Sequence, residues 1–133
     1  MSKQVIQTDQ APAPIGPYSQ AILSKGQLFV SGQVCIDPPT GDLKNENIQQ
    51  ETEQVMRNLK AILSAAGLNF SHVIKTTIFL TDMHQFSIVN EIYGAHLKKD
   101  ITDGSFPARE TVQVSALPKF VNVEISVIAQ IDE

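Results

Sequence analysis

Residues 121–131 read VNVEISVIAQI, and apolar side chains occupy every second position of this run. Because alternate side chains of a strand point to opposite faces of a sheet, the run predicts a strand with one apolar and one mixed face. The apolar face consists of Val121, Val123, Ile125, Val127, Ala129 and Ile131. Glu124 stands on the other face, as the only charged residue of the run. Such a strand needs a covering layer on its apolar side.

The preceding run, residues 109–117, alternates in the same way. We expect its apolar face to hold Val112, Val114 and Ala116, and its opposite face to hold Arg109, Thr111, Gln113 and Ser115. Only a short connection around residues 117–119 joins the two runs, so they are predicted to be antiparallel neighbours. Arg109 and Glu124 would then lie on the same uncovered face of the sheet.

The chain upstream supplies the covering helices. Between residues 48 and 66, apolar residues recur at three- and four-residue spacing, which predicts a helix that Asn47 caps and Gly67 ends. A second helix is expected after Asp82, following a strand over residues 73–80. Residues 18–24 and 27–36 form a predicted hairpin around Lys25-Gly26.

The order strand, hairpin, helix, strand, helix, strand, strand predicts an α+β fold, with two helices on one face of a mainly antiparallel or mixed sheet. With 133 residues and no linker or repeat, residues 1–133 form one expected domain. The other face of the sheet mixes polar groups with Phe29 or Leu28 and with Ile128. We expect other copies of the chain to cover part of this face, with free hydration as the alternative.

Composition and motifs narrow the function classes. Ten Lys and Arg against 14 Asp and Glu give a formal net charge of −4, which disfavours a nucleic-acid partner. The single Cys35 and three scattered His residues fit neither an internal disulfide nor a zinc site, and no GxSxG or phosphate-binding loop occurs. No run approaches the roughly 20 apolar residues that cross a bilayer, and no secretory signal is visible, so we expect a soluble, cytoplasmic protein without a membrane partner.

Arg109 and Glu124 are the main candidates for chemistry. Arg109 follows Phe106-Pro107-Ala108, whose proline stiffens the approach, and a guanidinium can hold a carboxylate through two hydrogen bonds. The alternative is an ordinary surface or ion-pairing arginine. Glu124 can orient or deprotonate a water if a pocket keeps it partly dry, because burial raises the pKa of a carboxyl. Its alternative is a structural salt bridge to Arg109 or to a lysine.

Two other residues are weaker candidates. Tyr18 follows Ile15-Gly16-Pro17, so a constrained loop would present its hydroxyl to a ligand, or its ring would pack at the loop edge. Cys35 lies between Val34 and Ile36 without a partnered His, which favours a buried, inert thiol over a nucleophile.

Four separated blocks, in order along nearly the whole chain, resemble the RidA (YjgF) family of reactive-intermediate deaminases. They are APIGPYSQ at 13–20, VSGQ at 30–33, NEIY at 90–93, and FPAR at 106–109 followed by Leu117-Pro118 and Val123-Glu124-Ile125. The resemblance implies a chorismate-mutase-like α+β fold that forms homotrimers, with active sites in the clefts between subunits.

The resemblance also implies an activity without a cofactor. Family members hydrolyse enamines and imines such as 2-aminoacrylate (2-iminopropanoate) and 2-iminobutanoate, released by pyridoxal-phosphate-dependent dehydratases, to 2-keto acids and ammonia. In such a site Arg109 would bind the substrate carboxylate and Glu124 would position the water. Tyr18 would line the pocket, and backbone groups near Gly32 and Thr111 would hydrogen-bond the substrate or water.

Two positions depart from the family pattern. Glu110 stands where a small or apolar residue is usual, and Thr111 where cysteine is frequent; alternation places Glu110 on the face opposite Arg109. Two other functions stay open at this point. One is a non-catalytic, regulatory binder of 2-keto acids. The other is an endoribonuclease or translation inhibitor, which the acidic composition disfavours.

Overall fold

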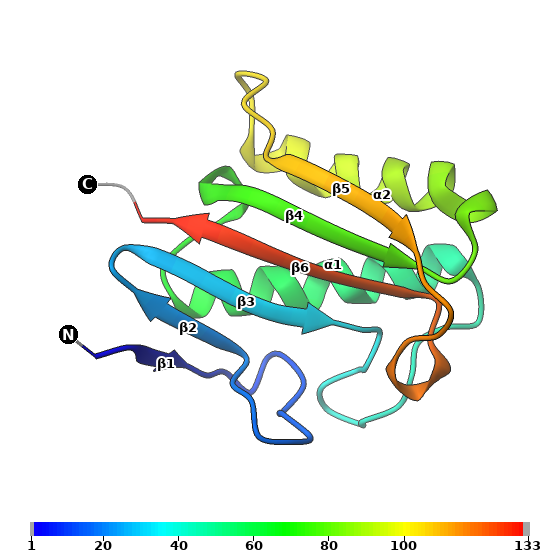
Figure 1. Cartoon of the computed structure of the whole chain (residues 1–133), viewed down its shortest axis with the longest axis horizontal. Coiled ribbons are helices and arrows are strands. Elements are labelled where there is room, and N and C mark those ends of the chain that lie inside the picture. Colours follow the sequence, from blue (N-terminus) through cyan, green and yellow to red (C-terminus); the bar gives the residue numbers. More distant parts are fainter. Residues whose placement is uncertain (1, 132–133) are drawn as a thin grey trace.

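The computed structural model describes residues 2–131, which fold into one sheet with two helices on one face (Figure 1). The strands are β1 (Gln4–Ile6), β2 (Ala21–Ser24), β3 (Gln27–Gln33), β4 (Val73–Leu80), β5 (Ala108–Gln113) and β6 (Val123–Gln130). The helices are α1 (Ile48–Ala65) and α2 (Phe86–Asp100), and short 3-10 turns cover Phe70–His72, Met83–Gln85 and Pro118–Phe120. Neither helix of the described residues has the length and apolarity needed to cross a membrane.

The sheet is mixed, as predicted, with strand order β1-β2-β3-β6-β4-β5. The β4–β5 pair is parallel and the other pairs are antiparallel. Lys25 and Gly26 both have positive φ, which gives the β2–β3 hairpin the two-residue turn that the sequence predicts. The Asn47 side chain accepts a hydrogen bond from Gln50 N at 2.7 Å and so caps α1.

The predicted pairing of the last two strands is wrong, because β4 lies between β5 and β6. Helix α2 forms a crossover from β4, and a crossover of this kind sets the next strand parallel to the first. The connection after β5 then passes the end of β4, where Val114 N donates to Leu80 O at 2.8 Å and Thr81 N donates to Asn122 O at 3.1 Å. Strand β6 thereby reaches the middle of the sheet (Figure 1).

The predicted common face of Arg109 and Glu124 is also wrong. Arg109 is paired with Thr76, which is fully buried beneath the helices, so Arg109 lies on the helix side. Glu124 is paired with Phe79, on the open side of the same strand. The assignment within β5 is therefore reversed: Thr111 and Gln113 share the helix side with Arg109, and Val112 is 42% exposed on the open face. Val114, just beyond the end of the strand, packs against the core as predicted. Glu110 does lie opposite Arg109, as alternation predicted.

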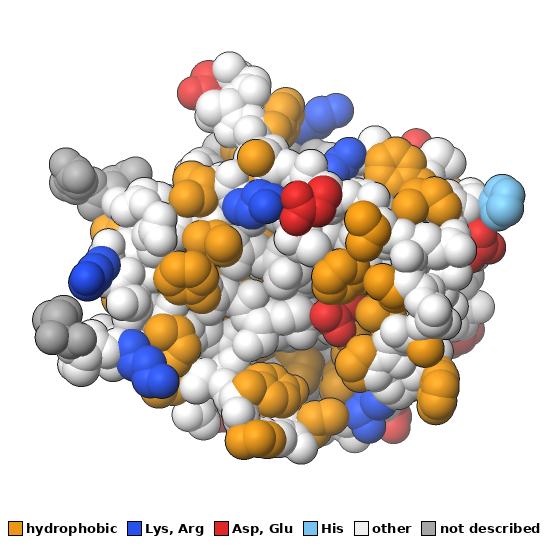
Figure 2. Space-filling model, in the orientation of Figure 1, with side chains coloured by type: hydrophobic (Ala, Val, Ile, Leu, Met, Phe, Trp, Pro, Cys, Tyr) orange, Lys and Arg blue, Asp and Glu red, His pale blue; other side chains and the backbone are white. Residues whose placement is uncertain are grey.

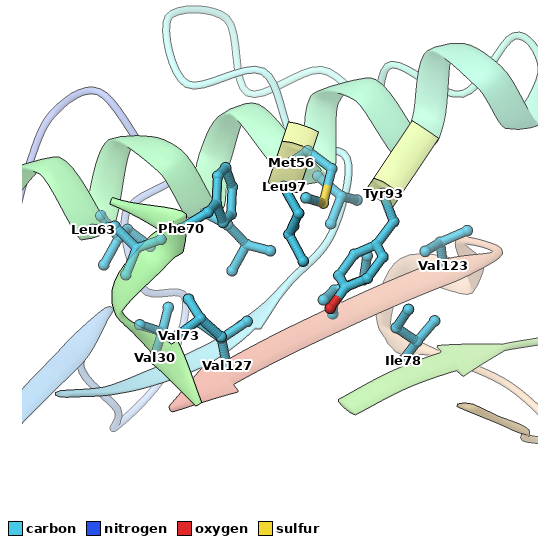
Figure 3. Packing of buried hydrophobic residues seen from close by; sticks show 14 of the residues in the cluster. Val30, Met56, Leu63, Phe70, Val73, Ile78, Tyr93, Leu97, Val123 and Val127 are labelled. Carbon is cyan, nitrogen blue, oxygen red and sulfur yellow. The ribbon is translucent and has the colours of Figure 1, made fainter. Parts of the chain in front are cut away.

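The core lies between the helices and the sheet. Side chains of α1, including Val55, Leu59 and Ile62, are fully buried against the apolar face of β6, whose burial alternates as the sequence predicts. Figure 3 shows Tyr93 and Leu97 of α2 and Met56 of α1 above Val123 and Val127 of β6. This packing fixes α2 over β4, and α2 in turn determines what surrounds Arg109.

Candidate functional site

Arg109 is held by side chains of α2. Its Nη1 donates to Asn90 Oδ1 at 2.5 Å, and its guanidinium carbon lies 5.4 Å from the Phe86 ring centroid and 5.3 Å from that of Tyr93. Both rings attract the cation through their faces. No carboxylate of residues 2–131 pairs with it, so the ion-pairing alternative is not what the described structure shows.

Tyr93 is itself fixed beneath Arg109. Its hydroxyl donates to Thr76 Oγ1 at 2.9 Å in the core, and burial raises the pKa of the phenol, so it stays a neutral donor. Beside this cluster, the buried Thr111 Oγ1 has no hydrogen-bond partner among the described residues. A cavity of about 520 Å³ extends from Arg109 along α2 and is bounded on its other side by Phe106 and Pro107.

The Glu124 side chain, by contrast, is positioned by the backbone of β3, which lies directly against it. It faces a β-bulge in β3, where the register with β6 shifts between Val30 and Gln33. A Cβ on Gly32 would overlap the Glu124 carboxylate and lie 2.7 Å from its Cδ. Only glycine therefore lets the strand and the carboxylate approach so closely.

The Glu124 carboxyl is half-buried, and this burial raises its pKa. No donor or cation of residues 2–131 pairs with it; Lys75, on the same open face, pairs with Glu110 at 3.3 Å instead. The structural salt bridge considered for Glu124 is therefore not formed within the described chain. A carboxylate in this state can accept a proton from a water more readily than an ordinary glutamate.

A second carboxylate supports Glu124 from behind the sheet. Glu51 of α1 is fully buried and accepts hydrogen bonds from Asn122 N at 2.7 Å, Asn122 Nδ2 at 2.8 Å and Val123 N at 2.9 Å. It thereby fixes the first residues of β6, directly before Glu124. Glu51 was not predicted from the sequence, although its position three residues after Ile48 and four before Val55 places an acidic residue in the apolar stripe of the helix.

Tyr18 lies on the open side, 49% exposed, in a loop that Gln20 organises. The buried Gln20 amide accepts from Thr8 N at 2.7 Å and donates to Pro12 O at 2.8 Å. Tyr18 lines a hollow of about 420 Å³ with Phe29 and Ser31, so this hollow adjoins the bulge at Gly32. Cys35 is fully buried, and burial raises the pKa of its thiol to about 11, in agreement with the inert thiol predicted from sequence.

The five predicted site residues thus form two groups on opposite faces. Arg109 and Thr111 lie on the helix side, whereas Tyr18, Gly32 and Glu124 lie on the open side. Arg109 is paired with Thr76 of β4 and Glu124 with Phe79, so the two residues are also offset by three residues along the strand, about 10 Å. The convergence of Arg109 and Glu124 is therefore absent within one chain. Figure 2 shows the open face, where hydrophobic side chains surround a largely uncharged centre.

Asn90 and Tyr93 stand at the two ends of the NEIY block, and neither was predicted to be a site residue. Both contact Arg109 from neighbouring turns of α2. Their three-residue spacing places them on the same face of the helix, and this pattern could have indicated a shared contact. No group of three His, Cys, Asp or Glu side chains within residues 2–131 has the arrangement of a metal site.

Comparisons with known proteins match nearly the whole chain. A family model described as Endoribonuclease L-PSP matches residues 8–131. "Protein DfrA" of Myxococcus xanthus is 50% identical over 131 residues, which cover 97% of this chain and 96% of that protein. The 2-iminobutanoate/2-iminopropanoate deaminase of Mus musculus is 46% identical over 127 residues, which cover 96% and 90%.

A solved structure gives the same fold. The Yersinia pestis protein YyfA, described as a protein of unknown function of the conserved Rid protein family, superimposes with a TM-score of 0.92 at 50% identity. The match covers 98% of this chain and all of that one. The two proteins therefore share the α+β arrangement over 98% of this chain.

Proposed function

Since the chain belongs to the Endoribonuclease L-PSP family, also called the YjgF/RidA family, we propose that it hydrolyses small 2-imino acids and their enamine tautomers to 2-keto acids and ammonia. The substrates would be 2-iminopropanoate and 2-iminobutanoate, after which the mammalian relatives are named. Arg109 binds the substrate carboxylate, and Glu124 positions the water.

The chemistry needs few groups, because an imine carbon is already electrophilic. The Arg109 guanidinium, one of whose donors is bound to Asn90, offers its other N–H groups to the carboxylate. A water attacks the imine carbon while Glu124 takes one of its protons. The nitrogen takes up that proton from Glu124, which gives a neutral carbinolamine. Glu124 then accepts the proton of the carbinolamine hydroxyl and passes it to the nitrogen, so the C–N bond breaks, ammonia leaves and the carbon–oxygen double bond of the 2-keto acid forms.

One observation carries the architecture of this proposal: Arg109 and Glu124 lie on opposite faces of one sheet. They share a substrate only when they come from two copies of the chain. We therefore place the site between subunits of a homotrimer, with Arg109 and Thr111 from one copy and Tyr18, Gly32 and Glu124 from the next. The half-exposed Phe29 and Val112 on the open face supply apolar surface for such a contact.

Mixing two inactive variants tests this arrangement. Arg109→Ala and Glu124→Ala chains are assayed alone and after unfolding and refolding together in equal amounts. Keto-acid release is followed from 2-iminobutanoate made in place by a dehydratase, with semicarbazide as the competing trap. In a closed ring, random mixing restores about one quarter of the sites, each combining an intact Arg109 with an intact Glu124.

The outcomes separate the alternatives. Recovery near one quarter of wild-type activity supports both residues and the split site. No recovery from two well-folded variants contradicts a site shared between copies. If the wild type accelerates nothing but binds 2-keto acids, the chain is a metabolite binder. The expectation that nucleic acid is not a partner stays a prediction.

A further inference from the structure

The turn Pro118–Phe120 between β5 and β6 presents an aromatic ring to solvent. Phe120 is 87% exposed, the largest exposed fraction among the large hydrophobic side chains of the described residues. Leu117 before the turn and Val121 after it are buried, so the turn is attached to the core on both sides. It lies at the end of the sheet where β6 begins (Figure 1). An apolar ring left in water gives up the stabilisation that burial would provide.

The backbone of this turn adds a second cost. Lys119 has a φ of 57° and Phe120 a φ of 55°, so two successive residues occupy the left-handed region. Glycine and asparagine adopt this region readily, whereas a bulky side chain does so only under strain. A hydrogen bond from Phe120 N to Leu117 O at 2.9 Å holds the turn in this form. Because both the conformation and the exposure of Phe120 lower the stability of the single chain, they indicate a contact outside that chain.

The turn is fixed close to Glu124. Phe120 precedes Glu124 by four residues, so their Cα atoms lie at most about 14 Å apart. The residues between them are anchored, since the buried Glu51 carboxylate accepts from Asn122 N at 2.7 Å and from Val123 N at 2.9 Å. The ring of Phe120 therefore belongs to the half of the candidate site that holds Glu124.

The proposed sharing of the site brings this turn to the boundary between two copies. In one chain the Glu124 carboxyl is only half-buried, so something else must cover it if its water is to be kept apart from bulk solvent. The half that holds Arg109 offers apolar surface against which a ring can pack. Phe106 is 46% exposed there, at the edge of the cavity beside Arg109.

We propose that Phe120 is a positioning residue of the shared site, whose ring packs against the Arg109 half of the neighbouring copy and closes the site on its Glu124 side. The inference rests on the proposed function. The ring keeps bulk solvent away from the water that Glu124 holds, so that this water stays aligned with the imine carbon. The strained backbone has a purpose in this arrangement, because it directs the ring away from its own chain.

Single variants separate this role from a role in folding. Phe120→Gly removes the ring and suits the left-handed backbone, so we expect the urea midpoint not to fall. The value of kcat/KM for 2-iminobutanoate should fall at least about tenfold, mainly through kcat, as the water loses its alignment to Glu124. Phe120→Tyr keeps the ring and should keep nearly the wild-type activity. Lys119→Gly is the matched control, since it relieves the neighbouring left-handed residue and leaves the ring in place.

Mixed assemblies test which half of the site the ring serves. In the mixture of Arg109→Ala and Glu124→Ala chains, every restored site takes its intact Glu124 from an Arg109→Ala chain. Adding Phe120→Gly to the Arg109→Ala chain should therefore lower the recovered activity by the same factor as in the single variant. Adding it to the Glu124→Ala chain should leave the recovered activity unchanged. Both mixtures contain the same number of altered rings and differ only in their placement.

The other outcomes overturn the inference. A fall of both the urea midpoint and the activity in Phe120→Gly would mean that the ring supports the fold. A Phe120→Gly chain that no longer assembles in analytical ultracentrifugation assigns the ring to assembly alone. Recovery that ignores Phe120→Gly in either chain removes the ring from the site and leaves the proposed function standing. No recovery in the parent mixture, where every Phe120 is intact, refutes the shared site itself.

Discussion

The two halves of the candidate site are built on different supports. Arg109 is braced by side chains, with Asn90, Phe86 and Tyr93 all reaching it from α2. Glu124 has no side-chain partner in the described chain and is placed by backbone, with Gly32 in front and the strand start anchored by Glu51 behind. Arg109 keeps two of its contacts when one of the three is removed. The position of Glu124 depends on the absence of a side chain at Gly32 and on the single buried carboxylate of Glu51.

The largest loss of activity is expected from adding one carbon at Gly32, beside Glu124. In Gly32→Ala the new methyl overlaps the Glu124 carboxylate, which must move by about 1 Å, and a misplacement of this size can lower kcat about a hundredfold. The overlapping atoms belong to a half-exposed, flexible side chain, so unfolding in urea should change by less than about 1 kcal/mol. Full activity in this variant would show that the close approach is unimportant.

Removing the anchor behind β6 should lower stability. Glu51→Ala leaves three donors of Asn122 and Val123 without an acceptor, and we expect a loss of about 3 kcal/mol in the free energy of unfolding. Glu51→Gln keeps the shape and one acceptor oxygen and should lose less. Urea denaturation measures both, with the exposed Glu46→Ala as control at within about 0.5 kcal/mol. Equal stability of Glu51→Ala and Glu46→Ala would rule out the anchor.

A smaller loss of activity is expected when one of the side chains that contact Arg109 is removed. Asn90→Ala removes one of three contacts of Arg109, so carboxylate binding weakens while the water at Glu124 is undisturbed. We expect KM to rise about fivefold to tenfold with kcat nearly retained. Steady-state assays on 2-iminobutanoate measure this, and the exposed Ser87→Ala on the same helix serves as control. A fall in kcat with unchanged KM would mean that Asn90 acts in the chemical step.

The smallest effect concerns the titration of Glu124. Burial raises the pKa of its carboxyl, so the folded state prefers the protonated form. This contribution to stability is therefore present below the ordinary glutamate pKa and is lost as pH rises through the raised value. The glutamine of Glu124→Gln does not titrate, so the variant does not lose this stability. Its free energy of unfolding relative to wild type should therefore increase with pH across that range. A pH-independent difference in the urea midpoints would contradict burial as the cause.

The sequence predicted the elements well because their signals are local. The alternation of β6, the stripe of α1, the Asn47 cap and the turn at Lys25-Gly26 depend on neighbours a few residues away. The neighbour of β5 depends instead on where the crossover through α2 ends. Alternation tells which side chains of β5 share a face, but not which face the helices cover. For that reason Arg109 and Glu124 were expected together.

The contacts around the two residues were harder to predict. That Gly32 faces Glu124 follows from a register shift between strands more than 90 residues apart along the chain, which no local pattern contains. The position of Glu51 in an apolar stripe was visible, but its three partners lie some 70 residues downstream. Local sequence patterns therefore predict whether a segment is a helix or a strand, but they do not predict which strands pair with each other.

The placement of Arg109 and Glu124 on opposite faces has a consequence for regulation by protein amount. If two copies share the site as proposed, a lone chain presents two incomplete half-sites to solvent, and a complete site forms only when chains meet. Under the split arrangement, specific activity falls on dilution below the dissociation constant of the assembly and recovers on concentration. The level of expression then sets not only how much enzyme a cell holds but what fraction of it works.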